Sequence, residues 1–380
     1  HLSEAFNSMA LRLDQAVAEN VRLSHEQAVA RAVTERLEAD RTAIARDLHD
    51  ELGQSITAAG IRTNYHDSGG AGAPVLLIHG SGPGVSAWAN WRLVMPVLAQ
   101  QARVIAPDMV GFGYSERPAG FAYSMDAWVR QAVGLLDALG IERTDLVGNS
   151  FGGGLSLALA IRHPERVRRL VLMGSAGVSF PLTEGLDAVW GYTPSVENMR
   201  AIMDYFAFDQ GLMSDDLARL RFEASIRPGF QESFAAMFPA PRQRWIEALA
   251  SAEADIRALP HQALVIHGRE DRVIPLSTSL TLSSWIQRSQ LHVYGQCGHW
   301  TQIEHAARFA RLVGDFLAEA HPDEPLPLQH PFWQEPRITI TPHISAATLR
   351  RESVAQIAAK MRRLHAGDSV AGIVNRLQGY

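Results

Sequence analysis

The alternation of hydrophobic and polar residues divides the chain into three stretches. Residues 1–52 are charged and free of glycine, and apolar residues recur among them at helical spacing, as at Leu11, Val17 and Val21. This pattern predicts a long helix or a coiled coil. Residues 53–320 instead carry short apolar runs separated by glycine-containing turns and helical segments, which predicts a parallel sheet covered by helices. Prolines interrupt residues 321–331, and the tail to residue 380 predicts a short strand and a final helix.

The middle stretch also predicts the order of its elements. Its apolar runs indicate buried strands over residues 75–79, 104–107, 145–148, 170–173, 264–268 and 291–294. The segment 181–258 breaks this rhythm, because it is helical, rich in Met, Phe and Arg, and lies between two strands. A lid inserted above the sheet is the simplest interpretation. The expected fold class is therefore α/β, with a helical lid and two flanking segments of different character.

One of these strands ends in a sequence suited to a nucleophilic serine. Gly148-Asn149-Ser150-Phe151-Gly152 follows an apolar run and precedes a helical segment, so Ser150 would stand on a sharp strand-to-helix turn. Glycines on both sides leave room for this turn, whose central residue adopts a strained backbone conformation. A single G-x-S-x-G also occurs by chance. Its surroundings must therefore decide between a nucleophile and a glycine-rich turn with an incidental serine.

A nucleophilic serine needs a base at neutral pH, and the base needs a carboxylate that fixes its tautomer. Asp271 follows the strand predicted at residues 264–268, and His299 follows the strand predicted at residues 291–294. The carboxyl ends of parallel strands converge on one crevice, where residues distant in sequence meet. Ser150, Asp271 and His299 thus predict a catalytic triad in the chain order of the α/β-hydrolases.

Hydrolysis through a tetrahedral intermediate also needs hydrogen-bond donors for the oxyanion. The loop over residues 79–84 follows a predicted strand and offers the backbone N–H groups of Ser81 or Gly82 beside that of Phe151. A nucleotide loop is the alternative for this stretch, but the third glycine of a dinucleotide fingerprint and its acidic partner are not in place. Cys297 lies just before the predicted base, and we expect it to be a small packed residue rather than a second nucleophile.

Composition narrows the possible partners. A formal net charge of -5 and an isoelectric point near 6.3 predict no general attraction to nucleic acid or membranes. Hydrophobic residues make up 47% of the 380 residues, enough for a sizeable core, yet no run of about 18 apolar residues predicts a membrane span. A single cysteine excludes an internal disulfide and suits a reducing cytoplasm. We expect a cytoplasmic enzyme for a small molecule, with no metal and no cofactor.

Several dispersed motifs carry a family resemblance. They are Gly80-Ser-Gly-Pro-Gly84, Asn90-Trp91, Asp108-Met-Val-Gly-Phe-Gly-Tyr-Ser115, Gly148-Asn-Ser-Phe-Gly-Gly153 and Gly298-His-Trp300. Together they resemble the meta-cleavage product hydrolases, carbon–carbon bond hydrolases of aromatic-ring degradation, over residues 53–320. The lid sequences Ile226-Arg-Pro-Gly-Phe230 and Phe238-Pro-Ala-Pro-Arg-Gln-Arg-Trp245 are most similar to the 2-hydroxymuconic semialdehyde hydrolases.

The resemblance implies roles for further residues. It places Arg221 where the family keeps a lid arginine for the substrate carboxylate, a task that suits a planar guanidinium. A solvated helix charge, with Arg219 nearby, is the alternative. Asn90 and Asn149 match polar positions of the family pocket, and Trp300 matches a wall residue.

The resemblance also implies a reaction. The substrate is of the 2-hydroxy-6-oxohexa-2,4-dienoate type, and His299 first helps to shift its dienol to the keto form. Ser150, or a water that it activates, then adds to the C6 carbonyl, and the C5–C6 bond breaks. The products are 2-hydroxypenta-2,4-dienoate and formate or another small acid. An acyl-enzyme route and a gem-diol route both fit the sequence, and a carboxylesterase of the same fold is the alternative activity.

The N-terminal flank resembles other families. Residues 7–13 are similar to the end of a HAMP linker, and residues 38–54 resemble the phosphoacceptor helix of sensor histidine kinases. His49 would be its phosphorylated residue, but the nucleotide-binding domain that should follow is missing, so autophosphorylation is not expected. Residues 53–57 fit either the end of this helix or the first hydrolase strand. A homo-oligomer formed through the N-terminal helix is the expected assembly.

The C-terminal flank, residues 321–380, resembles the end of D-2-hydroxyacid dehydrogenases of the glyoxylate/hydroxypyruvate reductase kind, through His330-Pro-Phe-Trp333 and Thr341-Pro-His343. His343 matches their acid/base histidine, but its partners and the cofactor loop are missing, so dehydrogenase activity is not expected. The two flanks predict a chimera, natural or artificial, in which the middle module alone is complete. The alternatives are an enzyme whose lid is gated by phosphorylated His49 and a signalling protein that uses the hydrolase fold as a sensor.

Overall fold

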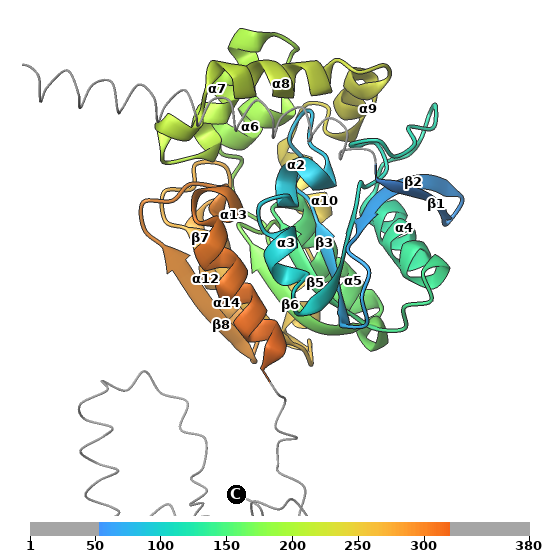
Figure 1. The fold of residues 1–380 in the computed structure, drawn as a ribbon. Coiled ribbons are helices and arrows are strands. Elements are labelled where there is room, and N and C mark those ends of the chain that lie inside the picture. Colours follow the sequence, from blue (N-terminus) through green and yellow to red (C-terminus); the bar gives the residue numbers. More distant parts are fainter. Residues whose placement is uncertain (1–52, 320–380) are drawn as a thin grey trace, which may run out of the picture. The chain divides into compact units, whose positions relative to one another are not determined.

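The computed structural model describes residues 53–319. The two flanks, with His49 and His343, lie outside the described residues. Residues 53–319 form an eight-stranded sheet with the strand order β1-β2-β4-β3-β5-β6-β7-β8 (Figure 1). The strands are β1 Gln54–Ala58, β2 Ile61–Asp67, β3 Ala73–Ile78, β4 Ala102–Pro107, β5 Thr144–Asn149, β6 Val167–Met173, β7 Gln262–Gly268 and β8 Ser289–Tyr294.

The prediction of a mostly parallel sheet is confirmed. Strands β3 to β8 pair in parallel, whereas β1 and β2 form an antiparallel hairpin that joins the sheet through β4. Every predicted strand is present, with an observed start two or three residues earlier in most cases. For residues 54–57 the structure decides between the two sequence interpretations, because they form β1.

Helices follow each strand from β3 to β8. Those outside the lid are α2 Ala87–Trp91, α3 Met95–Leu98, α4 Met125–Ala138, α5 Phe151–Arg162, α12 Leu276–Trp285, α13 Thr301–Glu304 and α14 Ala306–Ala318, with a 3-10 turn at Pro164–Arg166. Between β6 and β7 lie α6 Glu184–Trp190, α7 Val196–Phe206, α8 Asp215–Ser225, α9 Phe230–Met237, α10 Gln243–Leu249 and α11 Glu253–Arg257, with a 3-10 turn at Gln210–Leu212.

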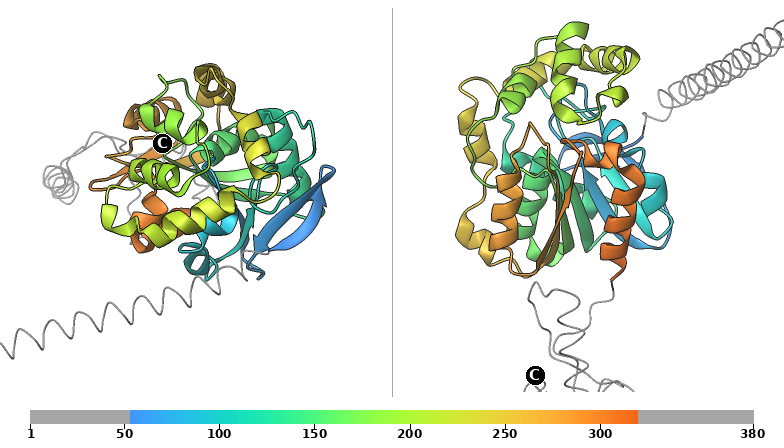
Figure 2. Two further views of the ribbon diagram at one scale, coloured as in Figure 1. Left: turned by 90° about the horizontal axis from the view of Figure 1, so that it is seen from above. Right: turned by 90° about the vertical axis from the view of Figure 1, so that its left-hand side faces the viewer.

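The central strands β3 to β7 are largely apolar on both faces because helices cover both faces. Leu76 and Ile78 of β3 point into the core formed with α4, α5 and α12, while Val75 and Leu77 point into a second core formed with α2, α3 and α14. The view along the sheet edge shows these two helix layers with the strands between them (Figure 2, right). The sheet therefore holds its carboxyl-terminal edge rigid between two packed cores.

The helical insertion forms a lid above that edge (Figure 1). Its helices begin at capping side chains: Thr183, Ser195 and Ser214 each accept a hydrogen bond from a backbone N–H in the first turn of α6, α7 and α8. The lid turns buried apolar residues such as Leu186 and Phe206 toward the same core as α4 and α5. Burial of apolar surface against this core therefore stabilises the position of the lid, in addition to its two chain connections to β6 and β7.

Candidate active site

Ser150 stands at the turn between β5 and α5. Its backbone angles are φ 56 and ψ −116, a conformation that is strained for a residue with a side chain. The flanking glycines are required by close backbone contacts: a Cβ on Gly148 would lie 2.2 Å from the Gly152 carbonyl oxygen, and a Cβ on Gly152 would lie 2.2 Å from the Ile78 carbonyl oxygen. The turn is therefore packed against the end of β3, and it directs Ser150 to the edge of the sheet under the lid.

Asp271 and His299 meet at the ends of β7 and β8. His299 Nδ1 lies 2.6 Å from Asp271 Oδ2, and both side chains are almost completely buried. The other oxygen, Asp271 Oδ1, accepts hydrogen bonds from the backbone N–H groups of Val273 (2.8 Å) and Ile274 (2.9 Å). Because the carboxylate is fixed on both oxygens, it holds the imidazole with Nδ1 as donor and leaves Nε2 to act as a base.

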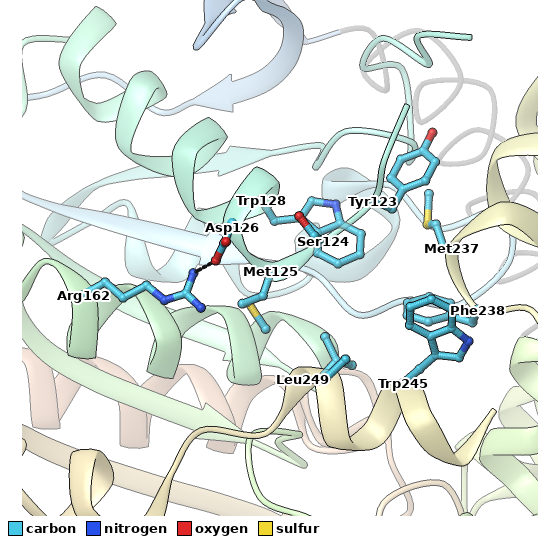
Figure 3. A pocket seen from close by; sticks show the side chains of 11 residues that line it. Tyr123, Ser124, Met125, Asp126, Trp128, Arg162, Met237, Phe238, Trp245 and Leu249 are labelled. Atoms are coloured by element: carbon cyan, nitrogen blue, oxygen red, sulfur yellow. Dashed lines mark hydrogen bonds and ion pairs between the residues drawn. The ribbon is translucent and has the colours of Figure 1, made fainter. Parts of the chain in front are cut away.

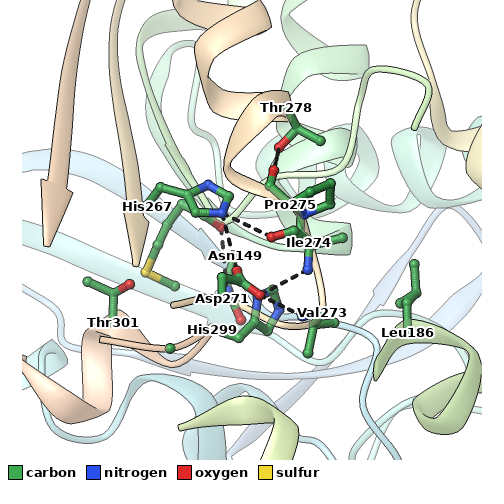
Figure 4. Close-up of polar contacts among 12 residues, drawn as sticks. Asn149, Leu186, His267, Asp271, Val273, Ile274, Pro275, Thr278, His299 and Thr301 are labelled. Carbon is green, nitrogen blue, oxygen red and sulfur yellow. Dashed lines mark hydrogen bonds and ion pairs between the residues drawn. The ribbon is translucent and has the colours of Figure 1, made fainter. Parts of the chain in front are cut away.

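A second histidine, His267, lies next to Asp271 on the side away from the lid residue Leu186 (Figure 4). His267 Nε2 donates to the Ile274 carbonyl oxygen at 3.0 Å and lies 3.4 Å from Asp271 Oδ2, while its Nδ1 accepts from the Ser279 hydroxyl at 2.7 Å. Burial lowers the pKa of His267, which keeps the ring neutral. His267 therefore supports the turn that carries Asp271 without adding charge to it.

Gly174 lies between the serine turn and the Asp271–His299 pair. The Ser150 N–H donates to the Met173 carbonyl oxygen at 2.9 Å, at the end of β6. The next residue is Gly174, on which a Cβ would lie 3.2 Å from His299 Nδ1 and 3.3 Å from Asp271 Oδ2. Ser150 and the Asp271–His299 pair thus lie on either side of residues 173–174, at one edge of the sheet.

The loop after β3 closes over the serine turn. A Cβ on Gly80 would lie 3.4 Å from the Ser150 Cβ, so the loop backbone passes directly beside the serine. The Ser81 hydroxyl accepts a hydrogen bond from Trp190 Nε1 of α6 at 3.1 Å, and a Cβ on Gly82 would lie 3.7 Å from the Cζ atom of Phe206. These contacts fix the loop that carries Ser81 and Gly82 beside the serine turn, and Phe151, the third predicted donor, follows that turn directly.

Arg221 of the lid and Trp300, the two residues predicted on the lid side of the site, contact each other. Arg221 of α8 is buried with 9% of its surface exposed, and its guanidinium lies 5.0 Å from the centre of the Trp300 ring. The Trp300 ring stacks on the Phe206 ring with the ring centres 4.6 Å apart, and the backbone N–H of Trp300 donates to the Phe206 carbonyl oxygen at 3.0 Å. Arg219, the competing arginine of the same helix, is exposed. The difference in burial therefore distinguishes Arg221 from Arg219, whereas the sequence alone does not decide between a buried and a solvated arginine.

The two predicted pocket asparagines differ in their surroundings. Asn90 at the end of α2 is buried, and its Nδ2 has no hydrogen-bond partner within the described part of the chain. A buried donor of this kind is satisfied when a ligand or water supplies an acceptor. Asn149 is buried between Gly80 and β6, with Nδ2 3.5 Å from the Met173 carbonyl oxygen. Asn149 therefore packs behind the serine turn.

A cavity of about 250 Å³ lies between α4 and the lid helices α9 and α10 (Figure 3). Trp128, Phe238 and Trp245 form much of its wall, and the Arg162–Asp126 ion pair, at 2.5 Å, lies at one side. Trp128 packs edge-on against Phe151 with the ring centres 4.7 Å apart. The lining includes none of the predicted triad residues, but its Trp128 contacts Phe151, the residue after Ser150.

Two aromatic residues of the lid were not predicted as site residues. Trp190 contacts the Ser81 hydroxyl, and Phe206 lies against both His299 and Trp300, with ring centres 6.0 Å and 4.6 Å away. The sequence carries no signal for them beyond the aromatic content of the insertion, because their roles depend on how the lid folds back. Cys297 is completely buried, and its burial raises the pKa of its thiol to about 12.

Residues 53–319 carry neither a membrane-spanning helix nor a cluster of metal-binding side chains. None of their helices has the length and apolar character that a membrane crossing requires. No group of three or more His, Cys, Asp or Glu side chains in this range is placed to hold a metal ion.

The sheet order, the strained serine turn and the lid between β6 and β7 define an α/β-hydrolase fold. In agreement, the family model for the alpha/beta hydrolase fold matches residues 73–306. A histidine kinase family model matches residues 40–67, but residues 54–67 of that match form β1 and β2 of the hydrolase sheet.

Individual relatives narrow the family further. A 2-hydroxymuconate semialdehyde hydrolase of Pseudomonas sp. is 77% identical over 270 residues, which cover 71% of this chain and 95% of the relative. A 2-hydroxy-6-oxo-2,4-heptadienoate hydrolase of Pseudomonas putida is 65% identical over 272 residues, covering 72% of this chain and 98% of the relative.

A solved structure agrees with these relatives. The meta-cleavage product hydrolase CumD of Pseudomonas fluorescens superimposes with a TM-score of 0.70 at 63% identity, covering 71% of this chain and 99% of that one. The chain therefore belongs to the α/β-hydrolases and, among them, to the meta-cleavage product hydrolases.

Proposed function

We propose that this protein hydrolyses the C5–C6 bond of 2-hydroxymuconate semialdehyde, a product of aromatic-ring cleavage. The supporting observation is the buried Asp271–His299 pair beside a strained Ser150, under a lid that carries a buried arginine. Relatives with 77% and 67% identity bear the name of this activity. The substrate has one carboxylate and one aldehyde, so it needs a cation at one end of the pocket and an oxyanion site at the other.

The proposed roles follow from this geometry. Arg221 binds the substrate carboxylate, and the unpartnered Asn90 Nδ2 donates to a polar group of the substrate. His299 Nε2 takes the proton of the dienol and returns it to C5, which creates the 2-oxo group as an electron sink. His299 then accepts the proton of the attacking hydroxyl, from Ser150 or from a water that Ser150 positions.

Attack at C6 produces an alkoxide, which the backbone N–H groups of Phe151 and of Ser81 or Gly82 stabilise. When the C5–C6 bond breaks, its electron pair passes into the 2-oxo system, and the resulting dienolate takes up the proton held by His299 to give 2-hydroxypenta-2,4-dienoate. The aldehyde carbon becomes formate, directly by the gem-diol route or through a formyl ester on Ser150. One water is consumed in either route, and Trp300 and Phe206 keep further water out of the pocket.

The test follows the loss of the yellow 2-hydroxymuconate semialdehyde chromophore by the purified full chain, with formate measured in parallel and p-nitrophenyl acetate as comparator. We expect turnover of the semialdehyde with equimolar formate, and a loss of at least about 10⁴-fold in kcat for Ser150→Ala. Ser284→Ala, at an exposed serine of α12, is the matched control and should keep full activity. Turnover of the ester alone would replace this proposal with the carboxylesterase alternative.

The proposal includes the division of the chain. Residues 53–320 form the catalytic module, and the flanks at residues 1–52 and 321–380 do not serve the chemistry. The kinase-like and dehydrogenase-like resemblances support a chimera on this view, and the single cysteine supports a cytoplasmic location. Deletion of residues 1–52 should leave kcat unchanged. A change in kcat would favour gating by His49, while a smaller assembly in gel filtration would support oligomerisation through the N-terminal helix.

A further inference from the structure

A buried histidine beside the oxyanion loop has no role in the proposed chemistry. His79 follows β3 directly, none of its surface is exposed, and its ring packs edge-on against Phe112 with the ring centres 5.1 Å apart. Its two ring nitrogens contact two different backbone groups: Nδ1 lies 2.7 Å from the Gly80 carbonyl oxygen, and Nε2 lies 3.0 Å from the Met109 nitrogen.

These two contacts fix the tautomer. The Met109 N–H can only donate, so His79 Nε2 accepts, and in a neutral ring Nδ1 then carries the proton. Nδ1–H consequently donates to the Gly80 carbonyl oxygen. Burial lowers the pKa of His79, which favours this neutral form.

The Gly80 carbonyl belongs to the same planar peptide unit as the Ser81 N–H. In a trans peptide the C=O and N–H bonds point in opposite directions, so fixing one fixes the other. This peptide lies beside the nucleophile, because a Cβ on Gly80 would be 3.4 Å from the Ser150 Cβ. From these contacts we infer that His79 is a positioning residue that aims the Ser81 N–H at the oxyanion. This inference rests on the oxyanion site of the proposed function.

The two bonds of His79 can be separated by substitution. The amide nitrogen of asparagine occupies the position of His Nδ1, so His79→Asn keeps the donor to Gly80 and loses the acceptor for Met109. The amide oxygen of glutamine occupies the position of His Nε2, so His79→Gln keeps the acceptor and loses the donor. A residue that merely holds the Met109 loop would need the acceptor, whereas a positioning residue needs the donor.

We expect His79→Asn to keep kcat within about threefold of wild type and His79→Gln to lose about 10- to 100-fold in kcat, with little change in KM. This loss is part of the 10²- to 10³-fold effect of removing an oxyanion donor outright. The control is His261, another buried histidine that contacts a backbone carbonyl, Pro164 O at 3.0 Å. His261→Asn and His261→Gln should lower the unfolding temperature and leave kcat unchanged.

Each rate is measured with the semialdehyde and with p-nitrophenyl acetate, and unfolding is followed by circular dichroism. Equal kcat values for the two His79 variants, or a larger loss in His79→Asn, would overturn the inference. If His79→Gln does not fold, His79→Ala takes its place as the variant without a donor. Wild-type protein that hydrolyses only the ester would refute the proposed substrate, while the order of the His79 variants would still be readable on the ester.

Discussion

The proposed carboxylate-binding role of Arg221 gives a prediction whose size the structure allows us to work out. Replacing Arg221 with glutamine keeps a hydrogen-bond donor in the lid but removes the charge and the two-pronged geometry. The site is buried, so solvent screens the charge of the substrate carboxylate only weakly. A hydrogen bond to a charged group contributes about 1.5–3 kcal/mol, and the loss of the fork should cost about 3 kcal/mol. Each 1.4 kcal/mol is a factor of ten, so kcat/KM for the semialdehyde should fall by about 100-fold.

The assay compares two substrates and two arginines. p-Nitrophenyl acetate has no carboxylate to bind, so Arg221→Gln should change its kcat/KM by less than about twofold. Arg219→Gln is the matched control, because Arg219 lies on the same helix and is exposed; it should leave both substrates unaffected. Equal losses on both substrates would show that Arg221 supports the lid rather than the carboxylate. A larger effect of Arg219→Gln would refute the assignment altogether.

Three other outcomes are expected. Gly152→Ala should destabilise the protein by about 1–3 kcal/mol in urea unfolding, because the added Cβ would lie 2.2 Å from the Ile78 carbonyl oxygen; wild-type stability would contradict the packing of the serine turn. Cys297 should resist a thiol reagent at pH 8 in the folded protein and react in urea, since its pKa is raised to about 12; rapid labelling without urea would contradict its burial. Leu264→Ala, in the middle of β7 at 1% exposure, should cost about 2–5 kcal/mol of unfolding free energy, and a cost below 1 kcal/mol would show that the strand is not packed on both faces.

The sequence predicts the parallel part of the sheet well because strands covered on both faces are almost continuously apolar. The β1–β2 hairpin cannot be predicted from apolar runs. Its strands, QSITA and IRTNYHD, are rich in polar residues, and they follow directly on a helical pattern with a kinase-like sequence. The physical reason is that the hairpin is an antiparallel edge, half exposed, where burial imposes little on the sequence.

The residues of the candidate site likewise differ in whether the sequence predicts them. Ser150, Asp271 and His299 are predictable because each follows a strand, and topology alone brings such positions together. Trp190 and Phe206 are not, because no periodicity states how a lid folds back onto the sheet. The roles of His79 and His267 depend on tautomers set by backbone groups of other loops, and no local pattern reveals those partners.

The lid forms hydrogen bonds with two loops of the candidate site. Trp190 of α6 binds the hydroxyl of the oxyanion loop at 3.1 Å, and the Phe206 carbonyl at the end of α7 accepts from the residue after His299 at 3.0 Å. A displacement of α6 and α7 that breaks these two bonds would free both the loop proposed to stabilise the oxyanion and the loop that carries the proposed base. The lid therefore couples the two loops mechanically, so a substitution that weakens one contact would be felt at the other through α6 and α7.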